Sequence, residues 1–289
     1  MKLGNLKNWK FIMLKNDLFG NRMKEYERTW DFKLTNRLPV IIRLDGNSFS
    51  KFTKKMNFEK PIDERFVDAM AETTKAVLEF CSGSQFGYFQ SDEITIFLRN
   101  DLELNTDSFL ANRIQKICSL VSSVASVSFC NYLNENKQTG QIKNVYAVFD
   151  CRVFVVPETE VNNVFLWRQM DAFRNYVNSF AYWKLKDKYG TKEVQKLLFK
   201  KKTNEVQEII YKELGVNIND MPVKYRRGIG MIKKEKEVLI DNIVKPEILE
   251  KFPDKKGTYI KRNEWECDYN IPRFNEDKNY INKFLKGNK

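Results

Sequence analysis

The hydrophobic pattern of the first hundred residues contains apolar stretches that meet an acidic residue at a turn. Residues 39–45 are almost continuously apolar and stop at Asp45-Gly46. Residues 85–91 and 93–99 are also largely apolar, and Ser91-Asp92 lies at their junction. Short apolar runs bounded by turn residues are typical of buried strands. We therefore predict three strands, one before Gly46 and one on either side of the Ser91-Asp92 turn.

Between and beyond these strands, apolar residues recur every three or four positions, which is the spacing of one helix face. The pattern predicts helices over residues 17–35, 61–81 and 108–134, with a short turn or helix at 48–55. Another apolar run, residues 145–156, predicts a fourth strand. Residues 39–156 therefore have the order β-α-β-β-α-β, and we predict an α+β protein with a ferredoxin-like core.

The second half of the chain has a different pattern. Helical spacing predicts helices over residues 159–189, 192–202 and 204–214, followed by a basic pair of strands at 225–233 and 236–241. Residues 243–289 mix charged and aromatic residues, and their role stays open at this point.

The charge balance points to an anionic partner. The chain carries 50 Lys and Arg against 38 Asp and Glu, a net charge of +12. A basic surface attracts polyanions, and nucleic acid is the commonest of these. A solvated, lysine-rich surface with no specific partner is the alternative.

The absence of histidine removes several catalytic classes. Without histidine the chain cannot use Ser-His or Cys-His catalysis, an H-E-x-x-H zinc site or a histidine general base. Its five cysteines are odd in number and show no C-x-x-C spacing, which favours a reduced, cytoplasmic protein. No apolar stretch is expected to span a membrane, and residues 2–14, an N-terminal segment that can be helical, are too interrupted for a signal peptide.

The two acidic turns become neighbours in the predicted fold. The first and third strands of a ferredoxin-like sheet are adjacent and antiparallel, so Asp45, ending one, lies beside Asp92, which precedes the other. Mg²⁺ prefers carboxylate and carbonyl oxygens, and Asp45, the Gly46 carbonyl and Asp92 can supply them. Such a pair suits two-metal phosphoryl transfer. Ordinary turn chemistry is the alternative, because Asp-Gly and Ser-Asp are common between strands.

The residues after Asp45 suggest a phosphate site. The amides of Gly46, Asn47, Ser48, Phe49 and Ser50 lie at a tight turn entering a helix and can form an anion nest. Lys60, with Lys54 or Lys55 nearby, can hold a triphosphate tail. Taken singly, each lysine is better explained as a solvated surface charge.

Two arginine-containing segments are weaker candidates for contacts with RNA. Residues 167–175 include Arg168 and Arg174, although an ordinary helix with Trp and Met in the core and Arg–Asp ion pairs explains this segment as well. Arg226-Arg227 can contact phosphates, or can simply lie at the charged end of an edge strand.

At these positions the chain resembles the tRNA-His guanylyltransferase superfamily, the 3′-to-5′ nucleotide polymerases. The resemblance covers about residues 20–235. The matching segments, after an opening helix at Asn21-Arg-Met-Lys-Glu-Tyr-Glu27, are Ile42-Arg-Leu-Asp-Gly-Asn-Ser-Phe-Ser-Lys-Phe-Thr53, Phe58-Glu-Lys-Pro-Ile-Asp63, Tyr88-Phe-Gln-Ser-Asp-Glu93, Phe149-Asp-Cys-Arg-Val153, Trp167-Arg-Gln-Met-Asp171 and Arg227-Gly228.

The resemblance implies a palm-type catalytic domain, as in ordinary polymerases. Asp45, the Gly46 carbonyl and Asp92 would bind two Mg²⁺ ions, with Asp45 and Asp92 as the catalytic residues. Residues 45–50, Lys60, Ser91 and Asp92 would line the nucleotide site. The substrates would be ATP, GTP or another nucleoside triphosphate, and tRNA, and the assembly would be a homotetramer.

The expected division of the chain follows. Residues 1–36 would form an N-terminal helical segment and 37–157 the palm domain. Residues 158–242 would form a helical and basic strand region for tRNA or oligomer contacts, leaving 243–289 as a tail.

One departure from the family pattern bears on the substrate. Eukaryotic members follow W-R-Q-x-D with His-Ile-Asn-Asn-Leu-Tyr-Asn, where this chain has Phe173-Arg-Asn-Tyr-Val-Asn-Ser179. Only Asn175 keeps its place, and Phe173 replaces the histidine. The chain therefore looks more like the bacterial and archaeal guanylyltransferase-like proteins, which resemble polymerases that repair 5′-truncated tRNA.

Two other hypotheses compete with such an enzyme. A nucleotide cyclase relative would share the β-α-β-β-α-β core and the acidic pair, although it would carry a Gly-Gly-Asp/Glu-Glu-Phe turn that is absent here. A catalytically idle tRNA-binding protein would keep the fold without turnover.

Overall fold

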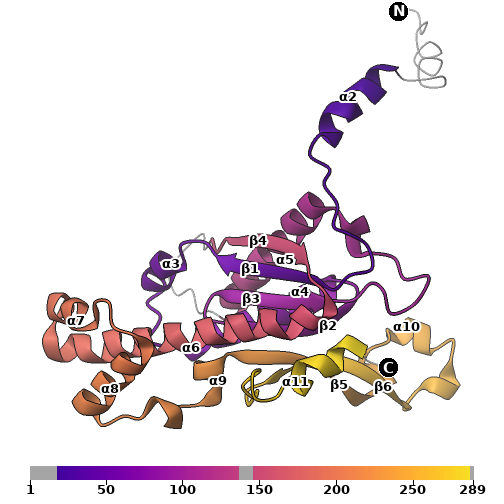
Figure 1. Ribbon diagram of the computed structural model, residues 1–289. Coiled ribbons are helices and arrows are strands. Elements are labelled where there is room, and N and C mark those ends of the chain that lie inside the picture. The colour runs from indigo at the N-terminus through magenta and orange to yellow at the C-terminus, as the bar shows by residue number, and fades with distance from the viewer. Residues whose placement is uncertain (1–17, 137–145, 287–289) are drawn as a thin grey trace, which may run out of the picture.

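The protein combines helices with one antiparallel sheet, seen in a computed structural model that describes residues 18–136 and 146–286 (Figure 1). The six strands lie in the order β4-β1-β3-β2-β5-β6, and all neighbours are antiparallel. Their bounds are β1 Val40–Gly46, β2 Ser84–Gln90, β3 Glu93–Leu98, β4 Phe149–Val155, β5 Ile229–Leu239 and β6 Tyr259–Asp268.

The expected pairing of the first and third strands is confirmed. β1 lies between β4 and β3, and Asp45 of β1 is in register with Glu93 of β3. Both faces of these central strands are covered, since Ile42 and Ile96 belong to one core and Ile41 and Phe97 to another. This double burial explains why the runs are apolar throughout rather than alternating.

Two helices, α4 (Glu64–Phe80) and α5 (Ile114–Glu135), cover one face of the sheet. α4 begins where the Asp63 carboxylate accepts a hydrogen bond from the Arg65 N–H (2.9 Å), which satisfies a free amide of the first turn. Its buried residues Met70, Thr73 and Val77 follow the helical spacing seen in the sequence.

The other face is covered by α6 (Glu158–Tyr189) and by the C-terminal segment. Phe165 of α6 packs with Phe86 and Tyr88 of β2 and with Phe274 and Phe284 near the C-terminus. The far half of α6 forms a separate core with α7 (Thr191–Leu198) and α8 (Thr203–Leu214), which lie together at one end of the molecule (Figure 1). The remaining helices are α2 (Leu18–Arg28), α3 (Phe49–Lys55), α9 (Val223–Arg227), α10 (Pro246–Leu249) and α11 (Asn279–Asn282).

The prediction of a basic strand pair at 225–233 and 236–241 is wrong. Residues 223–227 form α9, and 229–239 form the single long strand β5. Gly228 makes this change possible, because its φ of +79° is left-handed and a Cβ there would lie 2.5 Å from the Tyr88 hydroxyl. The partner of β5 is β6, from the segment whose role the sequence left open.

Several predicted helices are shorter than expected, and the one at 192–202, for example, ends at Leu198. The helix at 17–35 ends at Arg28, because the following residues pair with the start of α5, through a Lys33–Arg113 bridge and an Arg113–Asp31 ion pair. The helix at 108–134 begins at Ile114, since residues 110–112 have left-handed backbone angles. The predicted strand at 145–156 is β4, which begins only at Phe149, since the described residues 146–148 are not in a strand. Residues 2–14 and most of the loop at 134–144 lie outside the described residues.

Helix α5 corrects one expectation about the membrane. It is long and apolar enough to cross a bilayer by length and composition, whereas no such stretch was expected. Ile117, Val121, Ala125 and Phe129 on one side of it are nevertheless buried against the sheet. This is the pattern of a core helix in a globular domain.

Candidate active site

The carboxyl groups of Asp45 and Asp92 come together at one end of the sheet. The Gly46 N–H donates a hydrogen bond to the Asp92 backbone carbonyl (3.0 Å), which ties the end of β1 to the β2–β3 turn. A Cβ on Gly46 would lie 2.5 Å from the Phe49 ring, so only glycine lets this buried ring close over the strand end. Because Gly46 has no side chain, the first turn of α3, which carries Phe49, can pack against the end of β1.

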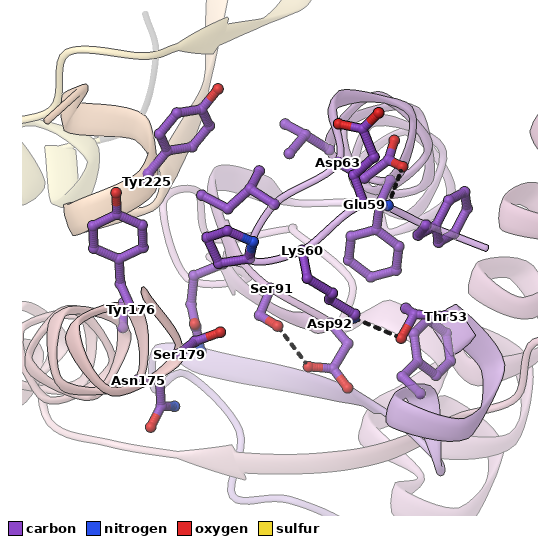
Figure 2. Close-up of a pocket in the computed structure, with 18 of the residues that line it drawn as sticks. Thr53, Glu59, Lys60, Asp63, Ser91, Asp92, Asn175, Tyr176, Ser179 and Tyr225 are labelled. Carbon is purple, nitrogen blue, oxygen red and sulfur yellow. Dashed lines mark hydrogen bonds between the residues drawn. The ribbon is translucent and has the colours of Figure 1, made fainter. Parts of the chain in front are cut away.

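The β2–β3 turn holds Asp92 in a fixed position. Only Ser91 and Asp92 separate Gln90 from its partner Glu93, and Ser91 adopts a left-handed φ of +48°. The Ser91 hydroxyl donates to Asp92 Oδ1 at 3.1 Å (Figure 2). A left-handed residue in a two-residue turn is expected of a tight hairpin.

The electrostatics of the pair fit a cation site. Burial raises the pKa of Asp92, and the nearby Asp45 charge raises it further, whereas Ser91 and Lys60 oppose the shift. Two carboxylates that share a partly buried position repel one another unless positive charge lies between them.

A cavity of about 330 Å³ opens beside Asp92 (Figure 2). Thr53, Lys60, Ser91 and Asp92 line one side. The Lys60 ammonium donates to the Thr53 hydroxyl (2.8 Å), and burial lowers the pKa of Lys60 although Asp92 and Asp63 act against this. One wall of the cavity thus presents the Lys60 ammonium, a cation of the kind that binds a polyphosphate, while the Ser91 and Thr53 hydroxyls donate to Asp92 and to the Ser50 carbonyl.

The opposite wall comes from α6 and α9, far away in the sequence. It includes Asn175, Tyr176 and Ser179 of α6, with Tyr225 of α9 (Figure 2). These were not predicted as site residues, although the spacing of Asn175, Tyr176 and Ser179 places them on one helix face. The signal in the sequence that could have identified them is this cluster of polar groups on α6, next to the apolar positions of the same helix.

The predicted nucleotide-site residues divide into three groups. Phe49, Ser50, Lys60, Ser91 and Asp92 line the cavity. Asp45 and Gly46 are not lining residues but lie against Asp92. Asn47 and Ser48 are exposed beyond the cavity, where the Ser48 hydroxyl donates to Asn47 Oδ1 (3.1 Å).

The predicted anion nest is wrong for its first two amides. The Gly46 N–H is bonded to the Asp92 carbonyl, and the Asn47 N–H is bonded to the Val148 carbonyl (2.8 Å). An amide that already donates to a backbone oxygen is not available to a phosphate.

Arg168 and Arg226 do not reach a surface where RNA can contact them. Arg168 is only 4% exposed, and it pairs with Glu93 (2.8 Å between Nε and Oε1) and with Asp171. Arg226 is 7% exposed and donates to the Met221 carbonyl. The interpretation of residues 167–175 as an ordinary helix therefore holds for its Arg–Asp ion pairs, but its placing of Trp and Met in the core is wrong, since Trp167 is 53% exposed and Met170 is 65% exposed.

The other two arginines differ in exposure. Arg174 lies on the surface in an ion pair with Asp171. Arg227 is partly buried and donates to the Ile271 carbonyl (3.2 Å). Of the four arginines, Arg174 is the most accessible to a polyanion.

The chemistry of the acidic end of the sheet fits Mg²⁺. Its donors are the Asp45 and Asp92 carboxylates and the Gly46 carbonyl, all oxygen. Among the described residues no cluster of three or more His, Cys, Asp or Glu is present. Mg²⁺ does not need one, because it usually binds through one or two carboxylates and completes its shell with water and substrate phosphates.

Comparison with known proteins decides the family. Residues 20–157 match the family model of tRNAHis guanylyltransferase, and residues 159–271 match the model of the C-terminal domain of the same family, Thg1. This chain belongs to the tRNAHis guanylyltransferase family. The match extends beyond residue 235, where the resemblance read from the sequence stopped, and includes β6.

Solved structures of the Thg1 family agree with this fold. A bacterial Thg1-like protein in complex with ATP has a TM-score of 0.73 and 32% identity, over 92% of this chain and 98% of that chain. A GTP complex of a bacterial Thg1-like protein has a TM-score of 0.68 and 30% identity, over 93% and 99%.

The curated relatives that this chain matches differ from it in length. The probable tRNA(His) guanylyltransferase of Drosophila melanogaster is 30% identical over 73% of this chain and 72% of its own length. The chain spans 63% of the length of an uncharacterized mimivirus protein that is 34% identical over 58% of this chain. It spans 41% of the length of tRNA(His) guanylyltransferase 1 of Arabidopsis thaliana, with 28% identity over 84% of this chain.

Proposed function

We propose that the protein is a Mg²⁺-dependent nucleotidyltransferase that adds nucleotides to the 5′ end of tRNA in the 3′-to-5′ direction. The observation that carries this proposal is the meeting of Asp45 and Asp92 beside a cavity that contains Lys60. Strands β1–β4 with α4 and α5 would form its ferredoxin-like palm, since their sheet order is β4-β1-β3-β2.

The residues of the site have separable roles in this reaction. Asp45, the Gly46 carbonyl and Asp92 would hold two Mg²⁺ ions, and bound Mg²⁺ would supply the Lewis acidity that lowers the pKa of the attacking 3′-hydroxyl and stabilises charge on the leaving group. Lys60, fixed by Thr53, would bind and orient the triphosphate of the nucleotide. Phe49, packed over Gly46, keeps water from the strand end.

The nucleotide substrates are ATP and GTP in this proposal. Bacterial Thg1-like proteins of similar fold were solved in complex with each of them. ATP would adenylylate the 5′-monophosphate of the tRNA and release pyrophosphate. The 3′-hydroxyl of the incoming nucleoside triphosphate would then lose its proton, attack the same 5′-phosphorus and displace AMP. The basic net charge supports tRNA as the polymer substrate, with Arg174 and Arg227 as candidate contacts. We further propose a homotetramer that works in the cytoplasm.

Repair of truncated tRNA is the preferred form of this activity. Phe173 replaces the histidine of the eukaryotic motif on α6, and the neighbouring positions Asn175, Tyr176 and Ser179 line the cavity. A changed cavity wall at this motif argues against obligatory addition of G−1 to tRNA-His.

The cyclase hypothesis loses support, since both Thg1 family models match.

Extension of labelled tRNA tests the proposal. tRNA-His, full length or lacking its first nucleotide, is given a 5′-³²P label and incubated with ATP, Mg²⁺ and each nucleoside triphosphate in turn. We expect the truncated tRNA to gain the templated nucleotide, and Asp92→Asn to lose this activity. If only the full-length tRNA is extended, by G−1 addition, the proposed repair specificity is refuted. If neither tRNA is extended, the proposed nucleotidyltransferase activity is refuted.

A further inference from the structure

Helix α6 presents two large apolar side chains to solvent that the proposed function does not use. Trp167 and Met170 are both more than half exposed, and neither belongs to any of the three cores of the described chain. Arg174 lies four positions after Met170 and is exposed as well, so the three residues form one stripe along the helix. An exposed tryptophan outside every core indicates a surface that contacts another molecule.

The stripe lies beside an uncovered part of the sheet. Successive side chains of a strand point to opposite faces, and Leu44 of β1 and Cys151 of β4 pack in the core under α4 and α5. Their neighbours Arg43 and Arg152 therefore point to the other face, which α6 crosses (Figure 1). α6 does not extend over β4, whose Arg152 side chain is 58% exposed.

The strand register brings these two arginines together next to the acidic end of the sheet. Arg43 is the partner of Arg152, and Asp45 is the partner of Asp150. Two residues of a strand span about 7 Å, so the arginine pair lies about that far from Asp45, on the same face. The Arg43 guanidinium is also 5.5 Å from the centre of the Trp167 ring, which joins the arginine pair to the stripe on α6. We call these five residues the arginine–tryptophan face: Arg43, Arg152, Trp167, Met170 and Arg174.

The Trp167 ring is held in place and still offers a flat surface. The Arg168 guanidinium lies 4.1 Å from its centre, and Arg168 is itself fixed by ion pairs with Glu93 and Asp171. Asp171 also pairs with Arg174, so these four charged groups balance one another. Cation–π contacts restrain the ring, yet 53% of Trp167 remains exposed. A restrained ring loses little conformational entropy when a flat partner stacks on it.

The remaining charges of the face favour an anionic partner. Arg43 contacts the Trp167 ring rather than a carboxylate of the described residues. Arg152 lies 3.7 Å from the Asp150 carboxylate, and such an exposed pair is weak. Asp45 and Asp150 lie at the strand end, where the proposed Mg²⁺ would offset their charge, whereas both arginines lie further along the strands. The face therefore separates a metal end from a cationic part.

We propose that the arginine–tryptophan face binds the 5′-terminal end of the tRNA acceptor stem. The terminal base pair would stack on Trp167, and the phosphates that follow the 5′-terminal one would contact Arg43 and Arg152. A duplex exposes the faces of its bases only at its ends, so a flat exposed ring beside cations selects an end rather than the side of a helix. The end that reaches Asp45 is the one that carries the reacting 5′-phosphate. This inference rests on the proposed function and specifies how its polymer substrate is held.

Binding of two RNA probes tests the proposal. One is a hairpin with the acceptor-stem duplex and a free 5′-phosphate, and the other is a dumbbell of the same base pairs in which loops close both ends. Each carries a fluorophore in a loop, and its anisotropy is followed during titration with the full-length protein in Mg²⁺ without nucleotide. Only the hairpin presents a terminal base pair, so the difference between the two dissociation constants isolates the contact with the end.

The variants separate stacking from charge. Trp167→Leu keeps an apolar side chain but removes the ring, and Trp167→Phe keeps a ring. Arg43→Gln and Arg152→Gln each remove one cation. Trp30→Leu and Arg262→Gln are the matched controls, since Trp30 is 69% exposed in the segment after α2 and Arg262 is exposed on β6, at the opposite edge of the sheet from β4.

We expect Trp167→Leu to bind the hairpin at least about fivefold more weakly, the lower end of the effect of stacking a base on an aromatic ring, and to bind the dumbbell as the wild type does. Trp167→Phe should recover most of the loss. Each arginine variant should weaken hairpin binding and lower the slope of log K against log salt by about one, as for loss of one phosphate contact. The controls should bind both probes like the wild type.

Equal binding of the hairpin and the dumbbell by the wild type, or wild-type hairpin binding by Trp167→Leu, would overturn the proposal. Sedimentation of the same variants examines the alternative occupant, a protein: if Trp167→Leu changes the mass of the assembly and leaves RNA binding intact, the proposal is wrong. Extension of tRNA by the wild type with no loss in Trp167→Leu would overturn this inference alone. Hairpin binding that depends on Trp167, without extension of any tRNA, would support it and refute only the proposed enzyme.

Discussion

The Gly46 N–H donates a 3.0 Å hydrogen bond to the Asp92 carbonyl, so two acidic turns that are 46 positions apart in the chain form one unit. The bond joins the end of β1 to the turn between β2 and β3. It holds the two carboxyl groups together even though their charges repel, and burial raises the pKa of Asp92 as a result. Two buried, mutually repelling carboxylates lower the stability of the fold, and such arrangements are typical of functional sites.

Asp92→Asn should separate function from folding. If Asp92 binds Mg²⁺ directly, as proposed, we expect nucleotide addition to fall by more than the roughly 10–100-fold that loss of an outer-shell partner of a metal costs. The free energy of unfolding at pH 7 without added metal should be unchanged or higher. The folded pKa of Asp92 lies above its unfolded value, so the ionised carboxylate opposes folding above that range and Asn removes this term.

Tritiated-nucleotide incorporation and urea unfolding, run side by side on the same preparation, check this prediction. Retained activity with unchanged stability would mean that Asp92 only shapes the turn. Asp45→Asn, measured in parallel, should lose activity to a similar degree.

Lys60→Met should weaken nucleotide binding. The ammonium group of Lys60 lies in the cavity, and a charge-assisted contact with phosphate contributes about 1.5–3 kcal/mol, or roughly 10–100-fold in affinity. Equilibrium dialysis with ATP and GTP measures the effect. Lys54→Met is the control, since Lys54 is an exposed lysine of α3 that does not line the cavity. Equal losses from the two variants would show that only net charge matters.

Arg168→Met should destabilise the fold above pH 7 by up to about 3–5 kcal/mol, because it leaves the buried Glu93 carboxylate, whose pKa burial already raises to about 7, without its partner. Urea unfolding reports the loss. The double variant Arg168→Met, Glu93→Gln should recover part of it, since the uncompensated charge is then gone. Additive losses in the double variant would contradict a buried ion pair, and a direct role in RNA binding would appear as weaker tRNA binding at unchanged stability.

Cys118 should react with iodoacetamide near neutral pH. A hydrogen bond from the Cys151 thiol lowers the pKa of Cys118 to about 7, so its thiolate fraction grows as pH rises through this value. Cys151→Ala should raise that pKa and slow labelling at pH 7 by about tenfold or more, because few unperturbed thiols are ionised there. Cys81 is the internal control, since burial raises its pKa to about 12.

Peptide mapping after labelling at several pH values distinguishes these sites. A labelling midpoint of Cys118 that does not move in Cys151→Ala would disprove the thiol–thiol contact.

Phe284→Ala should cost about 3–5 kcal/mol of unfolding free energy, as for other buried phenylalanines. The Phe284 ring is buried and stacks on Phe86 of β2 with 4.9 Å between the ring centres. Phe252→Ala is the matched control, because Phe252 lies in the same C-terminal segment but is exposed. Thermal and urea unfolding should show a lower midpoint for Phe284→Ala only; equal stability of both variants would mean that the C-terminus does not belong to the core.

Much of the central sheet was accessible from the sequence, since its strands are short, continuously apolar and bounded by turn residues. The positions of Asp45 and Asp92 followed because each lies where such a run stops, and a small sheet allows few arrangements of four strands. The pairing of β5 with β6 was not accessible, since no local pattern says which of two distant strands will be neighbours. The charged, exposed ends of β5 and β6 also lack the apolar run that marked the other strands.

The amino-acid sequence by itself determined where the acidic turns, the glycine step at residue 46 and the amphipathic helices lie, because backbone propensity and side-chain periodicity act within a few residues of one another. Only the tertiary structure decided that Arg168 is buried beside Glu93, that Tyr176 and Tyr225 close the cavity opposite Lys60, and that the amides of Gly46 and Asn47 are already bonded. These facts depend on which surfaces meet when the sheet and α6 pack. That choice is made by burial and electrostatics summed over contacts between residues far apart in the chain.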